Sequence, residues 1–317
     1  LLRIFAMKEL IEPLTSVEEE KILTETRYSR EQLKKDLEHL KDWLQKQTHL
    51  PPSRLTEGDK FLQMFLTGSK GSLETAKRKL DNYYTYRTHS ELLENRDPLI
   101  KGYSDVLDIG YVCLTPQTGK QAERLVYVGL TNPDPEKYDI VLQLRRFLDV
   151  MDIKLRLEEL STSHFVVLDN RNGVTGHLLR VKPTIIRELL QLVQDVYPFR
   201  ISGVLIINTP PFIDAILNKM VIPFLKKKLR ERIHVTSKGH EIVNKYVDKR
   251  LIPKDYGGDN LSIKELTDAW DKKILEKREW FINELSERTD ESKRVDLTGR
   301  EDGYFGVHGS LKKLVID

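Results

Sequence analysis

The sequence predicts an α/β protein in which an N-terminal helical domain precedes a domain built on a mainly parallel sheet. In residues 29–98, apolar residues recur at helical spacing in three segments separated by Gly and Pro. From about residue 100, short runs rich in β-branched residues alternate with helical stretches, a pattern typical of parallel strands with helical crossovers. We therefore expect four regions: an N-terminal segment at 1–28, the helical domain at 29–98, the sheet domain at 99–259, and a charged helix with a tail at 260–317.

Three helices are expected in the N-terminal domain. The first has Ser29 as its N-cap and ends before Pro51 and Pro52, since proline cannot continue a helix. The second and third are expected to begin after Thr56 and Ser72, which can cap their first turns. In each helix the apolar residues lie three or four positions apart, so each has one face to bury.

The second domain is expected to contain four strands with helices between them. The strands are expected at 124–130, 164–169, 203–208 and 232–237. The helices between and after them are expected at 137–160, 182–198, 211–229 and 263–285. The polar residues 286–303 are expected to be loosely ordered, and the apolar end at 304–317 is expected to dock on the body.

The composition is that of a soluble globular protein. Hydrophobic residues make up 39% of the chain and charged residues 32%, and the mean hydropathy is −0.45. The net charge of +3 is too small to indicate nucleic-acid binding. The single cysteine, Cys113, excludes an internal disulfide, so we expect a cytoplasmic protein. The longest apolar stretch, 201–213, is shorter than the ~20 residues that span a bilayer, and Met7 is a candidate native start.

Motifs that carry catalytic chemistry are absent from the sequence. It has no glycine-rich phosphate loop after a strand and no nucleophile elbow. His164 and His234 are expected to be core or sheet residues with satisfied hydrogen bonds rather than ligands. Asp169 follows a strand and is expected to cap the next turn rather than to act as an acid or base. We therefore expect no enzyme, no catalytic residue, no cofactor and no metal site.

Residues 208–234 combine an apolar stripe with a basic end. Between Lys219 and Lys238 there are seven Lys or Arg residues and one Glu, a local excess of six positive charges. The apolar stripe before this basic end contains Phe212, Ile213, Ile216, Leu217, Met220, Val221 and Phe224. One interpretation is a core helix, kinked at Pro223, with a solvated basic end. The other is a movable apolar lid beside a patch for anionic lipid headgroups.

Four stretches, in this order, resemble the CRAL-TRIO lipid-binding family, in the branch of the tocopherol and retinaldehyde carriers. They are DKFLQMFLTGSKGSLETAKRKLDNYYTYR at 59–87, HFVVLDNRNGVTGHLLRVKP at 164–183, YPFRISGVLIINTPPFIDAILNKMVIPFLKKKLRERIH at 197–234, and LIPKDYGGD at 251–259. The resemblance covers about residues 30–285. The FGVHGSLKKLVID tail resembles the C-terminal extension of invertebrate members.

The resemblance implies an intracellular carrier that sequesters one small hydrophobic lipid, such as a retinoid, tocopherol, carotenoid or similar isoprenoid. The lipid would lie under a mobile lid at about 209–225 and would be exchanged at membranes. By this resemblance the pocket is formed by Val141, Leu144, Leu148, His164, Val166, Leu168, Leu189, Leu192, Val193, Tyr197, Val204 and Ile206.

The resemblance also implies a basic patch for anionic membranes. Arg200, Lys228 and Arg232 stand at basic positions of the family, but Ser202 stands where a fourth is often basic. The family's arginine-rich stretch reads FLTGS at 65–69, so two arginines are missing. We therefore expect a monomer that associates transiently with anionic membranes, rather than tight phosphoinositide recognition. The alternative is a phospholipid- or phosphoinositide-responsive adaptor without transfer activity.

Overall fold

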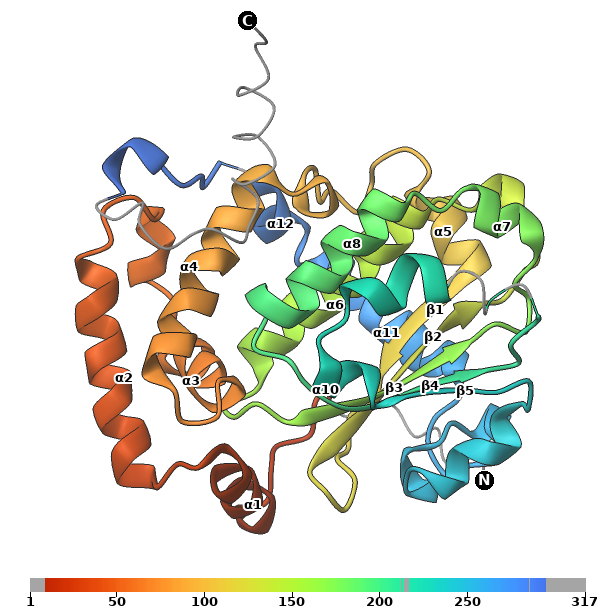
Figure 1. Ribbon diagram of the computed structural model, residues 1–317, viewed down its shortest axis with the longest axis horizontal. Coiled ribbons are helices and arrows are strands. Elements are labelled where there is room, and N and C mark those ends of the chain that lie inside the picture. The colour runs from red at the N-terminus through yellow and green to blue at the C-terminus, as the bar shows by residue number, and fades with distance from the viewer. Residues whose placement is uncertain (1–8, 212, 214–216, 285, 295–317) are drawn as a thin grey trace, which may run out of the picture.

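The computed structural model describes residues 9–211, 213, 217–284 and 286–294. Helices α1 to α4 lie on one side of the molecule, and a twisted sheet with its covering helices lies on the other (Figure 1). The helices are α1 Ser16–Thr26, α2 Arg30–Gln45, α3 Asp59–Gly68, α4 Leu73–His89, α5 Tyr103–Ile109, α6 Ile140–Leu157, α7 Thr175–Leu179, α8 Pro183–Gln191, α10 Lys227–Arg230, α11 Ile263–Glu276 and α12 Arg278–Glu284. The strands are β1 Gly110–Leu114, β2 Glu123–Leu130, β3 Ser163–Asp169, β4 Arg200–Ile207 and β5 Ile233–Val235.

The three helices expected in the N-terminal domain are present as α2, α3 and α4. The Ser29 hydroxyl accepts a hydrogen bond from the Gln32 amide at the start of α2, and Ser72 caps α4 in the same way. The predicted cap at Thr56 is wrong, because α3 begins only after Gly58, with no side-chain cap. Helix α1 was not predicted; its N-cap, Thr15, forms a capping box with Glu18.

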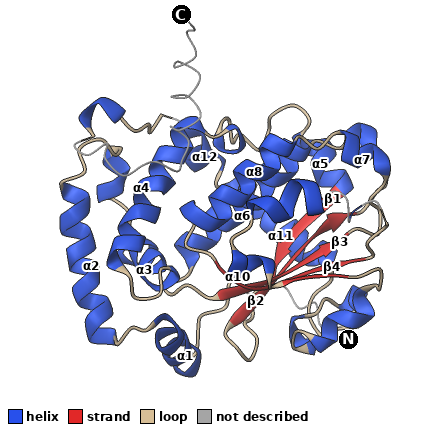
Figure 2. Ribbon diagram, viewed as in Figure 1, coloured by secondary structure: helices blue, strands red, loops and turns tan. Residues whose placement is uncertain are grey.

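The five strands, labelled in Figure 1, form one sheet in the order β1-β2-β3-β4-β5. Figure 2 shows the strands of the sheet in red and the helices around them in blue. The four predicted strands are confirmed and pair in parallel, while β1, which was not predicted, pairs antiparallel with β2. Since each parallel strand lies next to its predecessor and crossovers are right-handed, the crossover segments cover the same face of the sheet. The opposite face packs against the C-terminal region, where Trp270 in α11 donates a hydrogen bond to the Leu114 carbonyl at 3.0 Å.

Two long helices expected from the sequence are broken in the structure. The segment expected at 211–229 contains a π turn at Leu217–Val221, a 3₁₀ turn at Ile222–Phe224, and then α10. Pro223 has no amide hydrogen to continue the ladder, which accounts for the break. The helix expected at 263–285 divides at Lys277 into α11 and α12.

Residues 286–294 are not loosely ordered, as the sequence had suggested, but are bound to the N-terminal helices. The Thr289 amide donates to the Thr88 hydroxyl at 3.0 Å, and the Asp290 amide donates to the His49 carbonyl at 2.8 Å. Arg294 donates to Asp81 at 2.7 Å. The expected docking of 304–317 lies outside the described residues.

Candidate functional site

A cavity lies between the sheet and its crossover helices α6 and α8. Its volume is about 310 Å³. Among the described residues that line it, only Gln143 and His164 have nitrogen or oxygen atoms in their side chains. Such a cavity can hold an apolar molecule of small size.

Eight of the twelve residues predicted for the pocket line this cavity. They are Leu144, His164, Val166, Leu168, Leu189, Val193, Val204 and Ile206. The other four, Val141, Leu148, Leu192 and Tyr197, do not line it but pack in the core that α6 and α8 share with the N-terminal helices. Tyr197 is fully buried and donates its hydroxyl hydrogen to Asp152 at 3.0 Å, so it is not available to a ligand in the cavity.

The pairing of the strands explains which side chains face the cavity. Along β3, His164, Val166 and Leu168 face it, while Phe165 and Val167 lie in the core on the other face of the sheet. In β4 the alternation is interrupted, because the register with β3 shifts between His164 and Phe165. This irregularity allows two β4 residues of opposite sequence parity, Ile201 and Val204, to line the same cavity.

Sequence reasoning missed much of the cavity wall. The additional residues are Val126, Val128, Gln143, Phe147, Met151, Ile186, Leu190, Phe199, Ile201, Leu225, Leu229 and Ile233. Two of them could have been found from the register of the sheet, because Val126 is paired with Val166 and Val128 with Leu168. Paired residues on neighbouring strands lie on the same face.

The segment predicted as a lid contributes part of the cavity wall. Leu217 and Val221 line the cavity, and Ile213 lines a second chamber beside it. Met220 and Phe224 do not line the cavity; the Phe224 side chain is 40% exposed. Two further predicted lid residues, Phe212 and Ile216, lie outside the described residues.

Hydrogen bonds fasten this segment at its two ends. At the first end, Asn208 adopts a positive φ of 52° and donates from its side-chain amide to Asp169 at 2.8 Å. At the second end, the Gln194 side chain donates to the Phe224 carbonyl at 3.1 Å and accepts from the Lys226 amide at 2.8 Å. The segment is thus anchored to β3 and to the end of the α8 crossover.

Asp169 has the structural role that the sequence suggested. Its carboxylate accepts from the Arg171 amide at 2.9 Å, which caps the turn after β3 as predicted. The Tyr256 hydroxyl also donates to it, at 2.8 Å. With Asn208 as a further donor, the carboxylate fixes the turn and the beginning of the lid segment.

Two histidines were expected to be satisfied core or sheet residues, and the structure agrees with this only in part. His164 is 3% exposed, and neither of its ring nitrogens has a hydrogen-bond partner among the described residues. Burial, followed by the positive charge of Lys154, lowers the pKa of His164 well below its ordinary value, so the ring is neutral. His234 lies in β5, which confirms its expected place in the sheet, although its side chain is exposed and packs against Tyr246.

A second chamber adjoins the cavity toward the carboxyl ends of the strands. Its volume is about 280 Å³. The two chambers share Val128, Gln143, Leu168, Ile186, Ile206 and Leu217 in their walls. The second extends toward α7, where His177 packs against Tyr138 with ring centroids 4.9 Å apart. Together the chambers form an elongated apolar space.

The three residues predicted for the basic patch differ in their availability. Arg200 is buried, donates to the Ser161 carbonyl at 2.7 Å, and pairs with Glu25. Arg232 donates to the Ile201 carbonyl, whereas Lys228 is exposed.

Basic side chains border a shallow pocket next to the main cavity. It is lined by Lys226, Lys228 and Arg232. The wall that this pocket shares with the main cavity is formed by Val193, Phe199, Ile201 and Leu229. Lys70 lies near this group. Its burial, followed by the positive charge of Lys228, lowers the pKa of Lys70. An anion near Lys70 and Lys228 would reduce the repulsion between them.

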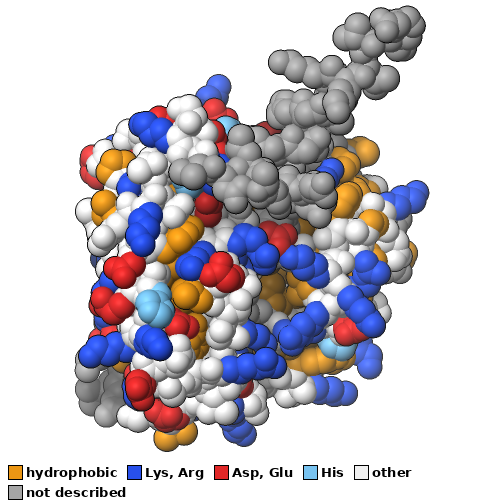
Figure 3. Space-filling view, turned by 60° about the vertical axis from the view of Figure 1, so that its left-hand side comes forward, with side chains coloured by type: hydrophobic (Ala, Val, Ile, Leu, Met, Phe, Trp, Pro, Cys, Tyr) orange, Lys and Arg blue, Asp and Glu red, His pale blue; other side chains and the backbone are white. Residues whose placement is uncertain are grey.

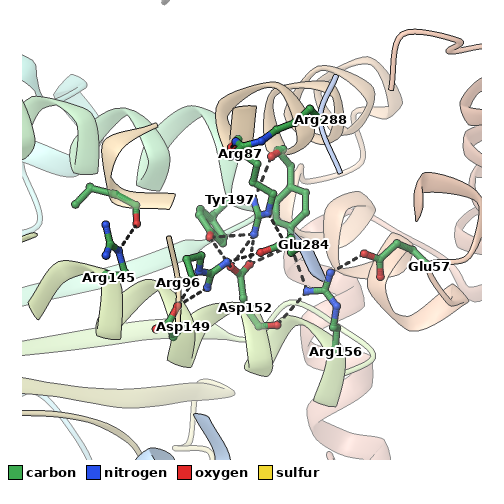
Figure 4. A network of polar contacts seen from close by, with 12 residues as sticks. Glu57, Arg87, Arg96, Arg145, Asp149, Asp152, Arg156, Tyr197, Glu284 and Arg288 are labelled. Carbon is green, nitrogen blue, oxygen red and sulfur yellow. Dashed lines mark hydrogen bonds and ion pairs between the residues drawn. The ribbon is translucent and has the colours of Figure 1, made fainter. Parts of the chain in front are cut away.

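The opposite side of α6 contacts a buried ionic network (Figure 4). Asp152 accepts hydrogen bonds from Arg87 at 2.6 Å and forms an ion pair with Arg96 at 2.6 Å. Arg96 also donates to Asp149 in α6, and both arginines pair with Glu284 in α12. Since these partners come from α4, α6, α12 and the loop before α5, the network fixes the cavity helix to the N-terminal and C-terminal regions.

The parallel sheet, its helices on one face and the apolar cavity between them define an α/β domain with an internal site for an apolar ligand. Residues 109–258 match the family model described as "CRAL/TRIO domain", and residues 29–102 match "Pinta-like, UBA domain". The chain therefore carries a region that matches the CRAL/TRIO domain.

The chain is also similar to several named proteins. The chain is 26% identical over 254 residues to "Alpha-tocopherol transfer protein-like" of Mus musculus, covering 79% of this chain and 72% of the relative. It is 25% identical over 206 residues to "Clavesin-2" of Rattus norvegicus, covering 64% and 63%. The crystal structure of Sfh5 aligns with a TM-score of 0.49 at 12% identity, covering 80% of this chain and 99% of that chain.

Two features are absent from the described part of the chain. No helix there has both the length and the apolar composition needed to cross a membrane. In the same residues, no group of three or more His, Cys, Asp or Glu side chains is arranged to hold a metal ion.

Proposed function

We propose that this protein is a carrier that binds a small hydrophobic lipid, such as a retinoid, tocopherol, carotenoid or similar isoprenoid, and exchanges it at membranes. The observation that carries the proposal is the apolar cavity under the lid segment, with two polar side chains in its wall. The relative named "Alpha-tocopherol transfer protein-like" is consistent with transfer of this kind of lipid. Binding and transfer, rather than catalysis, are the activities that an apolar chamber supports.

The hydrophobic effect provides the affinity. Each Å² of apolar surface removed from water contributes about 25 cal/mol, so an enclosed apolar cavity can retain a molecule that is almost insoluble in water. For the same reason release into water is slow, and exchange needs a lipid surface. Leu217 and Val221 are the lid residues that cover the ligand, and the exposed Phe224 can contact a bilayer.

Electrostatic attraction is proposed to bring the lid to the membrane. One face of the molecule shows Lys and Arg side chains grouped around an apolar area (Figure 3), the combination that anionic bilayers attract. Each Lys or Arg near such a surface contributes about 1 kcal/mol. Because Arg200 and Arg232 already donate to carbonyls of the chain, we propose transient association with anionic lipid rather than tight recognition of one phosphoinositide.

The direct test is solvent extraction of the purified, denatured protein followed by mass spectrometry. One isoprenoid or another neutral lipid per chain would support the carrier. A stoichiometric phospholipid would contradict the proposed ligand class. An empty extract, together with no uptake of lipid from vesicles, would contradict the carrier and favour an adaptor without transfer activity.

A further inference from the structure

Gln143 lies where the two chambers meet and lines both of them. The residue is 5% exposed, and neither Nε2 nor Oε1 of its amide has a hydrogen-bond partner among the described residues. Buried polar groups in proteins are nearly always paired. An amide with both of its functions unpaired at a cavity wall therefore points to a partner that is not part of the chain.

The backbone around this amide is shaped to accommodate it. A Cβ atom on Gly110 would lie 2.7 Å from both Nε2 and Oε1 of Gln143, so a larger residue at this position would collide with the amide. Arg146 holds the same stretch of backbone by donating to the Gly110 carbonyl at 2.8 Å. The position of the amide is thus defined by two neighbouring elements, β1 and α6.

The walls of both chambers are unsuited to an ionised group. Among the described residues that line them there is no Lys or Arg. The one carboxylate, Asp169, already accepts from Arg171, Asn208 and Tyr256. Burial also lowers the pKa values of His164 and His177, which disfavours a positive charge on either ring. A carboxylate or phosphate on the ligand would therefore be buried without a counter-charge, which is strongly unfavourable.

We propose that Gln143 recognises the oxygen of an uncharged lipid that carries a hydroxyl or carbonyl group. The oxygen lies at the junction of the chambers, and the apolar part of the lipid extends beneath Leu217 and Val221. An amide is both a donor and an acceptor, so it pairs with an alcohol or with an aldehyde. This inference rests on the proposed carrier function and specifies its ligand class.

The test measures uptake of three C20 isoprenoids from neutral phosphatidylcholine vesicles by delipidated protein. The probes are geranylgeraniol, its aldehyde and its carboxylic acid, whose flexible chains adapt to a cavity of this shape. At neutral pH the unaltered protein is expected to bind the alcohol and the aldehyde at least about tenfold more tightly than the acid, because the ionised acid lacks a counter-charge.

The substitution Gln143→Met removes the amide while keeping a similar volume. Affinity for the alcohol and the aldehyde is expected to fall about tenfold, the usual value of one lost hydrogen bond. The thermal midpoint of the ligand-free protein is expected to stay the same or rise, because an unpaired buried amide has been removed. The control Met151→Leu replaces an apolar residue of the same wall and leaves the Gln143 amide in place. It should therefore change the affinities for all three probes by one common factor.

The outcomes separate the inference from the carrier function. Uptake of none of the three probes would count against the carrier function and would overturn the inference with it. Equal uptake of all three, or unchanged affinity in Gln143→Met, would overturn the inference alone. A loss of affinity in His164→Phe but not in Gln143→Met would place the oxygen at the other end of the cavity and would also overturn the assignment to Gln143.

Discussion

The two sides of α6 differ in how they are buried. On one side Leu144, Phe147 and Met151 border the apolar cavity. On the other, Asp149 and Asp152 are fully buried and paired with arginines. Charged partners in a dry interior have few alternative arrangements, whereas an apolar wall beside a cavity lacks packing on one side. The comparison suggests that the ionic side holds the helix in place while the cavity side can adapt to a ligand.

The largest effect is expected from Asp152→Ala, which removes the acceptor shared by Arg87 and Arg96. Two buried guanidinium groups then lose a counter-charge, and breaking a buried ion pair typically costs about 3–5 kcal/mol. Urea unfolding of the ligand-free protein measures this loss. As a control, Asp268→Ala removes the exposed pair with Lys264 in α11 and should cost less than about 1 kcal/mol. Equal costs for the two variants would show that the network does not anchor α6.

The next largest effect should distinguish two leucines that lie one turn apart on α6. Leu148 is fully buried in the packed core, so Leu148→Ala is expected to cost about 2–5 kcal/mol. Leu144 borders the cavity, so its side chain already lacks neighbours on one side, and Leu144→Ala should cost less. Chemical unfolding gives both values, and lipid uptake should decrease in Leu144→Ala. If both variants lose the same stability, the wall is as tightly packed as the core.

The pattern of α6 could be predicted from the sequence, but the environment of its two sides could not. Regularly spaced apolar residues indicated a helix at 137–160, and the charged residues between them would ordinarily be solvated. Here Asp149 and Asp152 are buried because Arg87, Arg96 and Glu284 are brought to them from distant parts of the chain. No local pattern contains that information.

The same limit applies to the site. The correct face of β3 was assigned, and with it His164, Val166 and Leu168 in the cavity wall. Tyr197 was misplaced, because its partner Asp152 lies on the network side of α6. Gln143 was missed because a polar residue was not expected in an apolar wall. Its significance follows only from the absence of a hydrogen-bond partner among the described residues.

The pH dependence of stability should also report on the ionic side. Burial acts to raise the pKa of Asp152, but the neighbouring arginines outweigh it and lower the pKa from 3.8 to about 2. Between these values the unfolded chain binds a proton that the folded chain does not, so stability falls as the pH decreases from about 4 to 2. Asp152→Asn removes this titration, and its urea midpoint should depend less on pH in that window. Identical pH slopes in the two proteins would show that Asp152 is not held ionised by the network.

The smallest effect is expected at the basic edge of the cavity. Lys228→Glu replaces an exposed positive charge beside Lys70, and each unit of charge near an anionic bilayer is worth about 1 kcal/mol. Sedimentation with vesicles of phosphatidylcholine and phosphatidylserine should therefore show weaker binding at low salt, and the difference from the unaltered protein should shrink at high salt because ions screen it. Lys272→Glu makes the same change at an exposed position of α11, which packs against β1 and the core on the other face of the sheet, and should have little effect. If both variants weaken binding equally, net charge rather than the basic edge of the cavity attracts the protein to membranes.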